Sequence, residues 1–126
     1  MATDTFEPAN QTRNAVLAVN RAHTELVGRE PDPASELLPL LAQMAKLGTA
    51  ARSLVELTAE AVELLKDQPD LAVTSEDTAA SAATAAEWLR GDLVAATDHL
   101  MSATAALTQA RDAAARLHIT PNGGHH

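Results

Sequence analysis

The fold is decided by residues 75–117, which read SEDTAASAATAAEWLRGDLVAATDHLMSATAALTQARDAAARL. Small or apolar residues recur through this stretch at alternating spacings of four and three, the period of a helix that packs along one stripe. These positions are Ser75, Ala79, Ala82, Ala86, Leu89, Leu93, Ala96, Leu100, Ala103, Leu107, Ala110, Ala114 and Leu117. One heptad position holds leucine at 93, 100 and 107, and the other holds alanine at 96, 103 and 110. The stretch therefore predicts one long helix that a partner helix can approach closely.

Two shorter helices are expected upstream, each bounded by a joint that contains proline. The first covers residues 8–27, where Gly28 suits a C-terminal cap. The second covers residues 33–67, after a joint with two prolines. The long helix then covers residues 75–118, with a capping-box-like start at Thr74.

The helix predicted over residues 33–67 has an unusually wide apolar face. One row on it consists of Leu37, Leu41, Met44, Gly48, Ala51, Val55, Thr58, Val62 and Leu65, and a second row of Leu40, Leu47, Leu54 and Ala61. Such a face needs more than one neighbour, because a single partner helix covers only a narrow strip. Gly48 either permits close helix approach or is a tolerated helix-interior glycine, and Pro39 either sits in the first turn or kinks the helix.

These elements predict an all-α fold, an antiparallel three-helix bundle built on a long helical hairpin. Residues 1–118 form a single domain in this interpretation, and residues 119–126 form a flexible tail whose last two histidines are either native or the remnant of a purification tag. The first helix is too short to cover the hairpin. We therefore expect apolar surface that is left exposed or covered by another chain.

The amino-acid composition agrees with an all-α fold and disfavours some classes of binding partner. The 126 residues include 28 Ala but one Phe, one Trp and no Tyr, which disfavours strands. Nine basic against 17 acidic residues give a net charge of −8, so nucleic acids and anionic membranes are not expected partners. The chain has no Cys, no apolar run long enough to span a membrane, and no signal-peptide pattern at its start, so we expect a cytoplasmic protein.

No motif in the sequence specifies a reaction, and we expect neither an enzyme nor a cofactor or metal. None of the five histidines has a second one four residues away, as a helical zinc site requires, and the five glycines form no phosphate-binding loop. Asp92 and His99 lie one heptad apart on one helical face, where the ordinary role of both is to contact solvent.

Seven residues are the candidates for an interface: Trp88, Leu93, Leu100 and Leu107 on the long helix, and Leu40, Leu47 and Leu54 on the helix before it. Most of them are expected in the intramolecular core. Trp88 either covers the end of the first helix or anchors a partner, because Trp is enriched among interface hot spots.

The predicted function is a helical protein–protein interaction or assembly module that works with itself, as a homodimer, or with another helical protein. The Ala-rich amphipathic texture of residues 58–65, TAEAVELL, is similar to that of phasins, which coat storage granules. That resemblance implies an alternative function, a coat or carrier for apolar ligands or surfaces.

Overall fold

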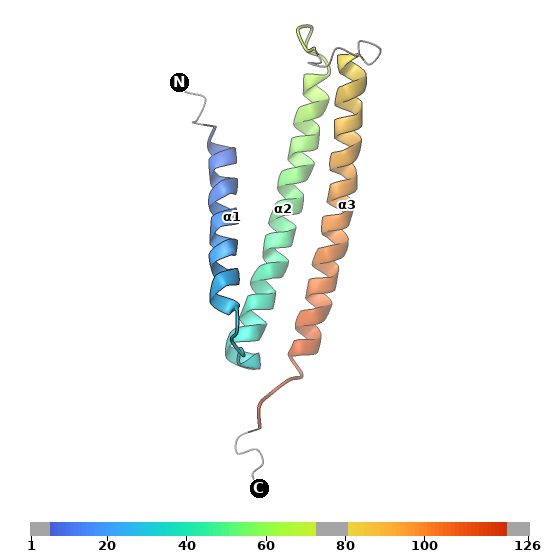
Figure 1. The fold of residues 1–126 in the computed structure, drawn as a ribbon. Helices are drawn as coiled ribbons and strands as arrows, with labels where there is room; N and C mark the ends of the chain where they lie inside the picture. Colours follow the sequence, from blue (N-terminus) through green and yellow to red (C-terminus); the bar gives the residue numbers. More distant parts are fainter. Residues whose placement is uncertain (1–5, 73–80, 121–126) are drawn as a thin grey trace. The chain divides into compact units, whose positions relative to one another are not determined.

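The computed structural model describes residues 6–72 and 81–120. All regular elements in these ranges are helical: α1 (Glu7–Leu26), the π-helical turn η2 (Pro33–Leu37), α2 (Leu38–Leu65) and α3 (Ala82–Ala114) (Figure 1). The predicted all-α class is confirmed. Contacts divide the chain into two units, Met1–Pro31 and Asp32–His126. The packing of the first helix on the others, and the single domain, stay predictions.

In the first unit, α1 agrees with the predicted helix to within one residue at each end. Pro8 lies in its first turn, where its missing N–H costs nothing. The helix stops at Leu26, and Gly28 follows with a φ of 75°, a left-handed conformation that glycine adopts without strain. Thus Gly28 ends the helix as predicted.

The second unit begins with a widened turn that Pro39 explains. The side chain of Asp32 caps it by accepting a hydrogen bond from the Ser35 backbone N–H (3.0 Å), which lowers the pKa of the Asp32 carboxyl. Leu37 N–H then bonds to the Asp32 carbonyl, five residues back (2.9 Å). Proline has no N–H to donate and its ring collides with the carbonyl four residues earlier, so a wider turn relieves the collision before α2 begins.

Helices α2 and α3 form the predicted antiparallel hairpin and lie side by side along their length in Figure 1. Three contacts fix its register. Lys66, at the end of α2, reaches Glu87 near the start of α3, and Glu63 reaches Arg90 one turn further along. Near the other end, Gly48 faces Thr104.

The contact line between the two helices is a row of buried and half-buried residues on each. On α2 these are Leu41, Ala45, Gly48, Arg52, Val55, Ala59, Val62 and Lys66, and on α3 they are Ala86, Arg90, Leu93, Thr97, Leu100, Thr104, Leu107 and Ala114. Among the described residues only Ala59, Val62, Ala86, Thr97 and Ala114 are buried. A hairpin buries one strip per helix, so its core is thin.

The predicted contact row of α3 is half right. The leucines at 93, 100 and 107 lie on the contact line, but Ala103 and Ala110 are exposed and Ala96 is half-buried. Threonines 97 and 104 take their place. Burial of Thr97 is tolerated because its hydroxyl donates a hydrogen bond to the Leu93 carbonyl of its own helix (3.0 Å). The buried Thr104 hydroxyl has no hydrogen-bond partner among the described residues and lies against Gly48.

On α2, too, the residues that face the partner helix differ from the predicted row. Met44 and Leu65 were expected on it, but Ala45 and Lys66 take these places and both larger side chains are exposed. Turning the helix brings the Lys66 ammonium to the acidic groups of the hairpin's polar side. It also moves the second leucine row of α2 away from α3.

The ends of α3 differ from the predicted range of 75–118. Ser81 is extended and caps the helix, its hydroxyl accepting a hydrogen bond from the Thr84 N–H (3.0 Å), so a helix that passes through residue 81 is wrong. The predicted start at Thr74 and Ser75 lies outside the described residues. The helix ends at Ala114, four residues early. Beyond it, the Arg116 and Leu117 N–H groups bond to carbonyls only three residues back, those of Ala113 and Ala114, so the last turn is tightened and does not continue as α-helix.

Candidate functional site

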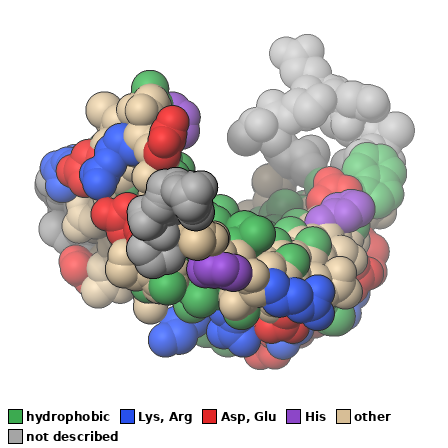
Figure 2. Space-filling view, turned by 90° about the horizontal axis from the view of Figure 1, so that it is seen from below, with side chains coloured by type: hydrophobic (Ala, Val, Ile, Leu, Met, Phe, Trp, Pro, Cys, Tyr) green, Lys and Arg blue, Asp and Glu red, His purple; other side chains and the backbone are tan. Residues whose placement is uncertain are grey.

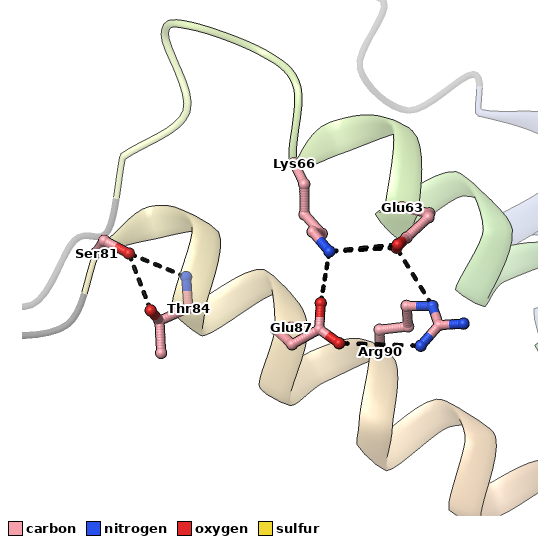
Figure 3. Close-up of polar contacts among 6 residues, drawn as sticks. All are labelled: Glu63, Lys66, Ser81, Thr84, Glu87 and Arg90. Atoms are coloured by element: carbon pink, nitrogen blue, oxygen red, sulfur yellow. Dashed lines mark hydrogen bonds and ion pairs between the residues drawn. The ribbon is translucent and has the colours of Figure 1, made fainter.

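The hairpin has a polar side, defined by ion pairs between and along its helices (Figure 3). The Lys66 ammonium lies 2.5 Å from a Glu87 carboxylate oxygen and 3.2 Å from one of Glu63. Arg90 lies 3.3 Å from Glu63 and 3.9 Å from Glu87, so two cations and two carboxylates form one network. On α2, Arg52 lies 3.8 Å from Glu56 on the same side.

The network shifts the pKa of two of its members. The hydrogen bond from Lys66, followed by the Coulombic attraction of its charge, lowers the pKa of Glu87. In return, hydrogen bonds to Glu87 and Glu63 raise the pKa of Lys66. Glu87 is exposed and Lys66 is partly exposed, so water screens the pair and the network orients the helix ends more than it stabilises the fold.

The opposite side of the hairpin is apolar, and the helical positions define it. Glu63 and Glu87 each come one residue after a contact-line residue, and their ion pairs place such positions on the polar side. In an antiparallel pair, residues that precede a contact-line residue lie on the side opposite to those that follow one. The residues before Arg52 and Ala59 on α2, and before Arg90 and Thr97 on α3, therefore lie on the side away from the ion pairs. We call this surface the apolar side.

The apolar side consists of a row of mostly large side chains on α2 and a row of mostly alanines on α3. The row on α2 consists of Leu40, Met44, Leu47, Ala51, Leu54, Thr58, Ala61 and Leu65, and the row on α3 consists of Ala85, Leu89, Asp92, Ala96, His99, Ala103, Ala106, Ala110 and Ala113. Met44, Leu47, Leu54, Leu65 and Leu89 are all exposed. Figure 2 shows a group of hydrophobic side chains near the middle of the view, and charged side chains with further hydrophobic ones among them along the lower edge.

The seven interface candidates fall into three groups. Leu93, Leu100 and Leu107 are half-buried on the contact line and belong to the hairpin's own core. Leu40 is half-buried on the apolar side, where Leu47 and Leu54 are 44% and 42% exposed.

Trp88 forms the third group, on the outer surface of α3. It is 63% exposed, and a Cβ added at Gly91 would meet no atom within 4 Å. The indole is therefore accessible to another molecule, and Gly91 nearby leaves open space. Whether Trp88 covers the first helix stays a prediction.

Some structural residues were not identified from the sequence. The contact-line residues Thr97 and Thr104 were missed because alanine at the preceding positions, 96 and 103, already continued the predicted row, although the seven-residue spacing of the threonines is also a heptad signal. The pair of Lys66 and Glu87 joins residues far apart in the chain, and no local spacing reveals it.

The described residues offer little for chemistry. Asp92 and His99 are exposed, and no three His, Asp or Glu side chains between residues 6 and 72 or 81 and 120 are placed to hold a metal ion. None of the described helices has the length and hydropathy to cross a membrane.

No family model, curated protein or solved structure matches the chain. The apolar side is therefore the candidate site.

Proposed function

We propose that the protein is a non-enzymatic helical interaction module that self-associates through the apolar side of its hairpin. One observation carries this proposal: Met44, Leu47, Leu54, Leu65 and Leu89 are exposed along one side of a hairpin that keeps its ion pairs on the other. Exposed apolar stripes of this extent mark protein interfaces.

The size of the apolar side suits a dimer. Helix α2 has 28 residues, so this side is about 40 Å long and, being two helices wide, about 20 Å across. That gives about 800 Å² per copy, which is what each partner contributes to a standard interface. Helix α1 has 20 residues and is about 30 Å long, so it cannot cover this length wherever it is placed.

The thin core of the hairpin supports the same proposal. None of its large apolar side chains is fully buried in the described residues. A hairpin with so little buried surface gains stability when a second copy covers its leucines, because binding to the folded form stabilises it by mass action.

A pair of matched variants tests the proposal. Leu54 on the apolar side and Val94 on the polar side are both 42% exposed, so Leu54→Lys and Val94→Lys introduce the same charge at equal exposure. We expect Leu54→Lys to raise the dimer Kd at least about hundredfold, because it buries an uncompensated charge in the interface, and Val94→Lys to change it less than about threefold. Sedimentation equilibrium measures both constants, and circular dichroism checks that the helices are retained.

Equal effects of the two variants, or a wild-type chain that is monomeric at all concentrations, would overturn the proposal. The second result would favour the alternative function as a coat or carrier for apolar surfaces. One observation supports that alternative: Leu57 and Leu64 on α2 and Trp88 on α3 are 63%, 72% and 63% exposed, so large apolar side chains are exposed beyond the apolar side as well.

A further inference from the structure

Two ionisable residues interrupt the apolar side, and both lie on α3. The row on α2 contains no charged residue, whereas the row on α3 contains Asp92 and His99. They lie seven residues apart and both are exposed, with Ala96 between them. When a partner covers this side, each loses contact with water, and burying a carboxylate or an imidazolium without a partner is costly.

The order of Asp92 and His99 along α3 allows the α3 rows of two copies to pair with each other. When two copies of α3 run antiparallel and cross at Ala96, Asp92 of each copy lies within one residue, about 1.5 Å along the helix, of the level of His99 of the other. The same arrangement places Leu89 opposite Ala103, so a large residue meets a small one. Alanine at most other positions of the row lets the two backbones approach closely.

The other symmetric arrangement lacks this complementarity. If α3 of one copy lay over α2 of the second, the register of the hairpin would bring Asp92 to Ala61 and His99 to Leu54, and this row offers no charged partner. The antiparallel crossing of α3 also places α2 against its own copy near Thr58, where Leu54 lies near Ala61 of the second copy.

We infer that the occupant of the apolar side is a second copy of this chain whose α3 packs antiparallel on α3 with its centre at Ala96, so that two pairs of Asp92 and His99 join the copies. This inference rests on the proposed function and adds to it the symmetry axis and the residues that set the register. Charge pairs of this kind fix orientation in helical assemblies.

A single cysteine tests the position of the axis, because the natural chain contains none. In Ala96→Cys, the two thiols of a dimer meet across the axis and can form a disulfide under mild oxidation. The control is Ala105→Cys, an exposed position on the opposite face of α3. We expect the Ala96→Cys dimer to cross-link at least about tenfold faster than the control, because thiols held together in a complex reach a high effective concentration.

Exchanging the two charged residues tests the register. In Asp92→His, histidines face each other across the interface, and in His99→Asp, carboxylates do. We expect each single variant to raise the dimer Kd by about tenfold and the double variant, which restores both pairs, to return it to within about threefold of the wild-type value. Both positions are exposed in the single chain, so the variants should keep their helical circular dichroism.

The outcomes separate this inference from the proposed function. A dimer that dissociates on Leu54→Lys but neither cross-links at Ala96 nor responds to the exchange would overturn the antiparallel pairing and leave self-association standing. A wild-type chain that stays monomeric and does not cross-link would overturn both, and would favour the alternative function as a coat or carrier.

Discussion

Gly48 marks a place where α3 leaves no room for a side chain on α2. A Cβ added there would lie 3.5 Å from the Thr104 Cβ and 3.8 Å from its Cα, and it would overlap the Thr104 hydroxyl. Glycine at this position therefore permits the close helix approach that the sequence left as one of two alternatives. Gly91, also inside a helix, has open space around it.

These two glycines give a matched prediction. Gly91→Ala should raise the free energy of unfolding by about 0.5–1 kcal/mol, because alanine is the better helix former. Gly48→Ala should lower it by about 1 kcal/mol, because overpacking costs about 1–3 kcal/mol and exceeds that gain. Urea denaturation at one fixed protein concentration measures both, and adding Thr104→Ala should rescue Gly48→Ala. A Gly48→Ala variant as stable as Gly91→Ala would contradict the close contact.

At this scale the sequence predicted the three central leucines of α3 correctly, but it also placed on the contact rows Leu65, Leu89 and Leu117, which are exposed, and it predicted the small residues poorly. Leu93, Leu100 and Leu107 stand out in the heptad pattern and lie on the contact line. Alanine contributes little when buried, so the pattern alone cannot decide whether Ala96 or its neighbour Thr97 faces α2. The decision depends on hydroxyl satisfaction and on the partner helix, and neither is a property of one segment.

At the scale of elements, helix type was predictable and helix ends were less so. Pro8 and Gly28 predicted the two ends of α1, because the effect of proline and of glycine on the backbone is local. The start of α3 is set by a hydrogen bond between Ser81 and Thr84, and several other serine and threonine residues nearby offered the same capping chemistry. The register of the hairpin was not predictable either, because it depends on contacts such as Lys66 with Glu87 across the joint.

The ion pairs that set this register give a pH-dependent prediction. Because the pKa of Glu87 is lower in the folded chain than in the unfolded one, its contribution to stability is present above the ordinary carboxyl pKa and is lost as the pH falls through the folded value. The Tm of the wild-type protein should therefore fall as the pH drops from about 5 towards 3, and it should fall less in Glu87→Gln.

The control for this experiment is Glu60→Gln, which removes the same charge from an exposed position on α2. It should retain the full wild-type dependence on pH. Thermal unfolding followed by circular dichroism gives Tm for all three proteins. Identical pH profiles for Glu87→Gln and Glu60→Gln would show that the pair with Lys66 contributes nothing to the folded hairpin.

At the scale of the whole molecule, the separation of the two sides of the hairpin carries the functional account. The sequence indicated more apolar surface than its helices could cover, because α2 carries two leucine rows and α1 is short. It could not indicate which row would turn away from α3, since that follows from how α2 and α3 rotate against each other. The structure places Leu47 and Leu54 on the open side and the ion pairs opposite.

The most direct test of self-association is the absolute mass of the wild-type chain in solution, measured by light scattering after size exclusion over an about hundredfold range of concentration. We expect a mass that rises with concentration towards twice the 13.2 kDa of one chain, or that stays at this dimer value throughout. A mass of 13.2 kDa at every concentration would contradict self-association.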